Sequence, residues 1–74
     1  MAFEPEVYAL IQKHTVITNF KSEVHARHRL VNMVYKFTRK RNTDNGMPDD
    51  LAKKAGSETS KRAAVEWRKR LDST

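Results

Sequence analysis

Cations recur at helical spacing in the middle of this 74-residue chain. Arg29, Lys36 and Lys40 are seven and four residues apart, which places the three side chains on one ridge of an α-helix. Asn32 falls beside the same ridge, and it is the one side chain there that can hydrogen-bond to a base edge. Cations fixed in a row can neutralise several phosphates and release their counterions. The spacing therefore predicts a binding site for a polyanion.

The charge of the chain is unevenly distributed, with a net value of +6 and a pI near 10.0. Residues 1–20 carry a net charge of −1, residues 21–42 carry +6 and residues 43–74 carry +1. A positive field concentrated in this way attracts polyanions and speeds their capture. Net charge of this size also serves ordinary solubility, so a solvated helix face is the alternative interpretation. The residues expected to contact nucleic acid are Arg29, Asn32, Lys36, Arg39, Lys40, Arg41, Lys61, Arg62, Arg68 and Lys69.

A long helix over residues 22–41 must position the ridge. Ser22 is the expected N-cap, because its hydroxyl can accept a hydrogen bond from the first turn. At 100° per residue, the apolar side chains of this helix cover an arc of roughly 200°. They are Val24, Leu30, Val31, Met33, Val34, Tyr35 and Phe37. Because a surface helix needs a narrower arc, this helix is expected to be a central pillar touched on two sides, or to serve a partner as well.

Turn and cap signals divide the rest of the chain. Pro5 and Pro48 suit first helical turns, and Asn45-Gly46 predicts a tight turn. Gly56 followed by Ser57 predicts a helix end. The predicted helices cover residues 5–14, 22–41, 48–55 and 59–71, with residues 15–20 as a connection packed on the core and residues 72–74 frayed. The whole chain is thus expected to be a single all-α domain, a small three- to four-helix bundle in which Trp67 fills the core.

The segment Leu51-Ala52-Lys53-Lys54-Ala55-Gly56, followed by a polar turn and a helix, resembles the helix-turn-helix of bacterial repressors. A small Ala52 at the crossing and Gly56 four residues later would let two short helices pack at a steep angle. The sequence departs from that pattern where the recognition helix should bury a branched apolar residue, because Arg62 occupies the position. Ala64 and Trp67 fit only a turn that is two residues longer. An ordinary helical hairpin with a glycine turn is the alternative.

Several classes of function find no support in the residues. The absence of cysteine excludes thiol catalysis and cysteine-ligated zinc, and it favours a reducing cytoplasm. His14, His25 and His28 lack the further ligands that zinc needs, so no metal or other cofactor is expected. No nucleophile has a partnered base and no glycine loop could cradle phosphate, so an enzyme is not expected. The acidic first residues and the short apolar runs predict neither a signal peptide nor a membrane span.

Two hypotheses of function follow. The first is a small regulatory protein that binds nucleic acid, DNA in preference to RNA, through the phosphate backbone. The second is a protein-interaction module, such as a phage-type inhibitor that docks on a nucleic-acid-handling enzyme like RNA polymerase. The wide apolar arc of residues 22–41 motivates the second hypothesis, and a homodimer would use the same surface.

Overall fold

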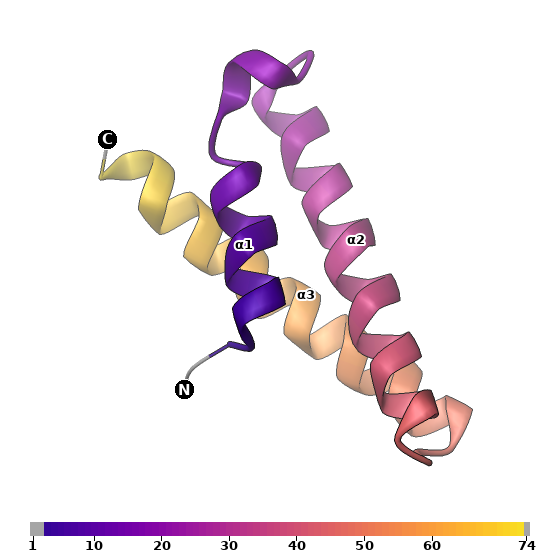
Figure 1. Cartoon of the computed structure of the whole chain (residues 1–74). Helices are drawn as coiled ribbons and strands as arrows, with labels where there is room; N and C mark the ends of the chain where they lie inside the picture. The colour runs from indigo at the N-terminus through magenta and orange to yellow at the C-terminus, as the bar shows by residue number, and fades with distance from the viewer. Residues whose placement is uncertain (1–2, 74) are drawn as a thin grey trace.

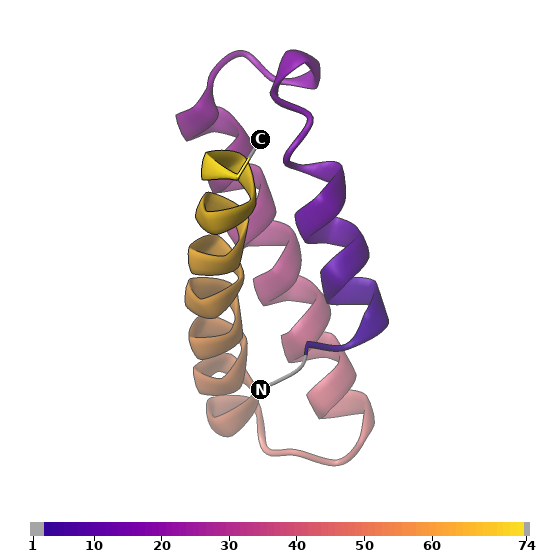
Figure 2. The same ribbon diagram turned by 90° about the vertical axis from the view of Figure 1, so that its left-hand side faces the viewer.

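The computed structural model describes residues 3–73, which form three α-helices and one short 3₁₀ turn (Figure 1). The elements are α1 (Pro5–Lys13), η1 (Ile17–Asn19), α2 (Glu23–Asp44) and α3 (Asp49–Asp72). Seen from the side, the three helices lie alongside one another (Figure 2). The most extensive contact joins α2 and α3, and α1 packs against both. The prediction of an all-α bundle is confirmed for this part of the chain, which has no strand and no helix long and apolar enough to cross a membrane.

Local signals set most helix ends as predicted. The Ser22 hydroxyl accepts a hydrogen bond from the backbone N–H of His25 at 3.1 Å, which caps the N-terminus of α2. Pro5 lies in the first turn of α1. Gly46 has a φ of +95° in the turn between α2 and α3, a conformation that side chains with a Cβ rarely adopt. The structure confirms these three predictions. Each could be made from the sequence because it depends only on neighbouring residues.

The predicted helix end at Gly56 is wrong. A single helix, α3, replaces the two helices expected at 48–55 and 59–71. Gly56 is buried where α3 meets α2, and a Cβ built on it would lie 3.0 Å from the carbonyl oxygen of Tyr35. Glycine is therefore present for a close approach of two helices rather than for a turn. Within the helix, the Ser60 hydroxyl donates to the carbonyl of Ser57 at 2.9 Å. The polar residues that follow Gly56 are therefore accommodated in α3 without a turn.

Three other expectations, for α3 and for the end of α2, need correction. The turn that the helix-turn-helix resemblance requires after Gly56 is not present, because α3 continues through it. The predicted end of α2 at Arg41 is three residues short of the observed end at Asp44. Fraying was expected from residue 72, but α3 runs to Asp72 and the backbone N–H of Ser73 donates to the Lys69 carbonyl at 3.1 Å. Thr74 lies outside the described residues.

The core lies between the three helices. From α2 it receives a stripe at four-residue spacing, Ala26, Leu30 and Val34, which are all fully buried. From the other elements it receives Val7, Ile11, Ala63 and Trp67, with Ile17 and Phe20 of the predicted connection packed against it. The prediction that Trp67 fills the core is confirmed.

The apolar arc of α2 is only partly used. Leu30 and Val34 are buried as expected, and Ala26, which was not in the predicted arc, is buried with them. Val24 and Met33 keep 58% and 36% of their surface exposed. The helix is a central pillar that contacts both α1 and α3, but it leaves part of its apolar surface uncovered.

One buried hydrogen bond fastens α3 to the end of α1. The indole Nε1 of Trp67 donates to the backbone carbonyl of His14 at 2.7 Å. His14 is itself 1% exposed, and its Nδ1 donates to the Leu10 carbonyl at 2.7 Å while its ring stacks on Phe20. The last turn of α1 is thus held in place by the buried side chains of Trp67 and His14 and by the half-buried ring of Phe20.

We expect Trp67→Phe to lower the free energy of unfolding by about 2–3 kcal/mol. The substitution keeps an aromatic ring but leaves the buried His14 carbonyl without its donor, and it removes part of the ring volume. Urea denaturation followed by far-ultraviolet circular dichroism measures the change. A loss below about 0.5 kcal/mol, within the range of ordinary surface substitutions, would show that the bond contributes little.

Gly56→Ala should lower the free energy of unfolding by about 1 kcal/mol, although alanine is the better helix former. The gain in helix propensity is about 1 kcal/mol. The added methyl group would meet the Tyr35 backbone at 3.0 Å, and overpacking of this kind typically costs about 1–3 kcal/mol. The same urea experiment decides the sign, and a more stable variant would show that α2 and α3 can move apart freely.

Candidate nucleic-acid interface

Three of the predicted cations form an exposed line on α2, which we call the α2 row (Arg29, Lys36 and Lys40). Burial of Ala26, Leu30 and Val34 fixes the rotation of α2 and turns the row toward solvent. The row spans about 16 Å at the rise of an α-helix. None of its three side chains has an ion-pair partner among residues 3–73. Their charges are therefore free to meet an external anion.

The α2 helix carries no acidic residue between Glu23 and Asp44. Asn32 is exposed on the same side as the α2 row, where the sequence placed it. The exposed His28 and the half-buried His25 come from the first half of the same helix. Because no carboxylate of α2 interrupts this face, the fields of its cations add.

Arg39 lies on α2 as predicted but is engaged by α3. Its Nε donates to one carboxylate oxygen of Asp49 at 3.1 Å and its Nη2 to the other at 3.3 Å. Lys53 reaches the same carboxylate at 3.4 Å. The hydrogen bonds from Arg39 act first and that of Lys53 adds to them, so the pKa of Asp49 lies below its ordinary value of 3.8, although desolvation, the second-largest effect, acts in the opposite direction. Arg39 therefore ties the start of α3 to α2.

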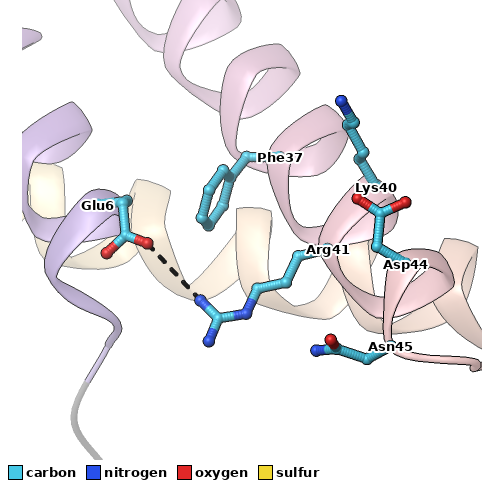
Figure 3. Close-up of a pocket in the computed structure, with 6 residues that line it drawn as sticks. All are labelled: Glu6, Phe37, Lys40, Arg41, Asp44 and Asn45. Atoms are coloured by element: carbon cyan, nitrogen blue, oxygen red, sulfur yellow. Dashed lines mark ion pairs between the residues drawn. The ribbon is translucent and has the colours of Figure 1, made fainter.

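Arg41 is also committed within the protein. Its guanidinium forms an ion pair with Glu4 and lies 3.6 Å from the carboxylate of Glu6, so it joins the end of α2 to the start of α1 (Figure 3). The pair with Glu4 joins residues 37 positions apart in the chain. The structure thus separates Arg39 and Arg41 from the α2 row, although all of them lie on one helix.

Of the cations predicted on α3, two are free of ion pairs in the described part of the chain and two contact other side chains of the protein. Lys61 and Lys69 are exposed and have no ion pair within the described range. The Arg62 guanidinium lies over the Phe3 ring at 5.0 Å, and the Arg68 guanidinium lies over the Trp67 ring at 5.0 Å and near the Glu23 carboxylate at 3.6 Å. Arg62 and Arg68 therefore help to hold the helices together, whereas Lys61 and Lys69 are available.

Lys54 was missed by the sequence-based set. It is exposed on α3, seven residues before Lys61 and fourteen before Arg68, so the three lie on one side of the helix. The predicted break at Gly56 placed Lys54 in a different helix from Lys61 and Arg68, and this hid their seven-residue spacing. A prediction of one continuous helix would have shown that spacing.

The three histidines are dispersed. His14 is buried, His25 accepts a hydrogen bond on Nδ1 from the Lys21 backbone N–H at 3.5 Å, and His28 is exposed. In the described part of the chain, no three His, Cys, Asp or Glu residues gather closely enough to hold a metal ion.

Comparison of the chain with family models, with curated proteins and with solved structures finds no match. A function can therefore be argued only from the geometry of the chain itself. The α2 row is exposed and regularly spaced, and its side chains form no ion pair within the described part of the chain. A line of cations with these properties can bind the phosphates of a polyanion without breaking any contact in the fold.

Arg39→Gln should raise the pKa of Asp49 toward its ordinary value of 3.8, because the first of the interactions that lower it is removed. A depressed carboxyl pKa gives stability that is present above the unfolded pKa and disappears as the pH falls through the folded pKa. The stability difference between the native protein and the variant should therefore shrink on acidification below about pH 4. Carboxyl NMR titration measures the pKa, and urea unfolding at each pH measures the stability.

Lys40→Gln is the matched control for this titration. It removes a cation from the next residue, which forms no ion pair with Asp49 among the described residues. An equal rise of the Asp49 pKa in both variants would show that the general field of α2, rather than the Arg39 hydrogen bonds, lowers it.

Proposed function

We propose that the protein binds nucleic acid through the phosphate backbone, with the α2 row as its principal contact. The observation that carries the proposal is the line of three exposed cations without ion-pair partners among residues 3–73, on a helix that has no acid between Glu23 and Asp44. Side chains of this kind position a protein on a duplex and carry little sequence information. The protein is therefore a binding module with limited sequence discrimination, and the proposal assigns it no catalytic step.

Duplex DNA is the expected form of the ligand. The major groove of B-DNA admits an α-helix, whereas the major groove of A-form RNA is too deep and narrow for side chains to read. With the α2 row against phosphates, Asn32 is the side chain on that face that can reach a base edge. Lys61 and Lys69 on α3, together with Lys54, add to the attraction. This role fits the cytoplasmic location expected from the cysteine-free sequence.

Simultaneous replacement of Arg29, Lys36 and Lys40 by alanine should weaken binding to a fluorescein-labelled DNA duplex about tenfold or more at low salt. The slope of log affinity against log salt concentration should flatten by about three, one for each lost phosphate contact. Fluorescence anisotropy across a salt series measures both quantities. Absence of binding by the native protein at low salt would overturn the proposal.

The control for this experiment is the triple variant in which Lys13, Lys21 and Arg27 are replaced by alanine. It removes the same total charge from exposed positions outside the α2 row. If its salt slope flattens as much as that of the row variant, net charge rather than the row accounts for the binding.

A protein-docking role is the second candidate. The exposure of Val24 and Met33 on α2 favours it, because apolar side chains at 58% and 36% exposure can be covered by a partner. A nucleic-acid-handling enzyme such as RNA polymerase would be such a partner. A pull-down from nuclease-treated lysate separates the two roles, since a partner bound through nucleic acid is lost with it.

A further inference from the structure

A groove between α1 and α2 is left unused by phosphate binding. Ala9 and Leu10 of α1 form one wall and Met33 and Phe37 of α2 form the other, so its lining is almost entirely apolar. Leu10 and Phe37 pack against the core with part of their surface exposed, and Met33 is 36% exposed. A phosphate backbone gains nothing from such a lining. The groove therefore needs a ligand with an apolar surface of its own.

The groove continues along α2 toward the end of the helix. Glu6 and Phe37 line both this groove and the adjoining cleft, which is also lined by Lys40, Arg41, Asp44 and Asn45 (Figure 3). From Met33 to Asn45 the two hollows extend about 18 Å along α2. That length matches three to four turns of a helix laid between α1 and α2.

The rims of the apolar groove beside Met33 are basic, whereas the adjoining cleft adds one acid, Asp44. Met33 is four residues from Arg29 and three from Lys36, so these members of the α2 row flank it on the helix surface. Lys13 lies on the α1 side. Glu6 is the acid of the apolar groove, and the guanidinium of Arg41 lies 3.6 Å from its carboxylate. The ligand must therefore place negative charge on both sides of an apolar stripe.

We propose that this groove binds an acidic amphipathic helix of a partner protein. The apolar stripe of that helix covers Leu10, Met33 and Phe37, and its Asp and Glu side chains face the α2 row and Lys13. A groove between two helices accepts a third helix by ordinary ridge packing. Pairing with an extended peptide is disfavoured, because residues 3–73 provide no strand edge.

A second copy of the chain is a poor occupant for electrostatic reasons. A two-fold contact through this groove would bring the α2 row of one copy close to the same row of the other. Each chain also carries a net charge of +6, which opposes association. Charge complementarity thus selects an acidic partner over a basic copy.

The helix and a nucleic acid would share the α2 row. Under the proposed function, an acidic helix in the groove is consequently an antagonist of phosphate binding. This consequence rests on the proposed function, whereas binding of the helix depends on the groove and its basic rims and not on any binding of DNA.

The test uses the full chain and two synthetic helical peptides. Both carry leucine at positions i, i+3 and i+7, one with glutamate and the other with lysine on the flanking positions. We expect the glutamate peptide to bind at least tenfold more tightly by fluorescence anisotropy, with amide NMR shifts at Leu10, Met33 and Phe37. Equal affinity for the two peptides would overturn the proposal.

Met33→Gln and Val65→Gln form a matched pair of variants. Both remove an exposed apolar side chain without changing the charge, but Val65, which is 57% exposed, lies on α3 outside the groove. Met33→Gln should weaken the glutamate peptide at least fivefold and leave DNA affinity unchanged, whereas Val65→Gln should alter neither. Equal effects of the two variants on the peptide would contradict the groove as its site.

Sedimentation completes the test. Self-association of the native chain that is lost in Met33→Gln would identify a second copy as the occupant and overturn the proposal. Binding of the glutamate peptide by a chain that does not bind DNA would support the groove and reject the proposed function, so the two failures are distinguishable.

Discussion

The rotation of α2 about its own axis is the constraint on which the surface of this protein depends. One stripe, Ala26, Leu30 and Val34, must face the core while the same helix contacts α1 and α3. Three fully buried side chains at four-residue spacing leave no freedom for the helix to turn, because a change of register would place cations in the core. The α2 row is exposed for this reason. Its geometry is set by packing rather than by any interaction of its own.

The contact of α1 with the other two helices is less extensive, and polar groups assist it. The pair that Arg41 forms with Glu4 joins exposed side chains, and surface ion pairs of this kind contribute about 0–1 kcal/mol. The hydrogen bond from Trp67 to the His14 carbonyl is buried, so its loss would leave an unsatisfied acceptor. The buried bond and the side chains around it therefore secure α1 more than the surface charges do. Arg41 joins the end of α2 to the start of α1 at the surface.

The sequence predicted the features that depend on near neighbours and missed those decided by distant ones. The Ser22 cap, the Gly46 turn and the exposed spacing of the α2 row follow from residues within one or two helical turns. Gly56 could not be interpreted in this way, because a glycine for a helix end and a glycine for a close helix contact look alike until Tyr35 is placed beside it. The pairing of Arg39 with Asp49 and of Arg41 with Glu4 spans 10 and 37 residues. Sequence reasoning counted both arginines as free for that reason.

Phosphate binding and helix binding would respond differently to salt, although both use the α2 row. Counterion release makes phosphate affinity fall steeply as salt rises. The attraction of the apolar lining around Leu10 and Met33 for a helix is hydrophobic, so salt does not screen it. Salt would screen only the flanking charges of a bound helix. Raising the salt concentration would therefore shift the competition toward the acidic helix. Because the buried stripe of α2 sets the row beside the groove, the fold would couple the two proposed ligands, and one bound ligand would block part of the surface that the other needs.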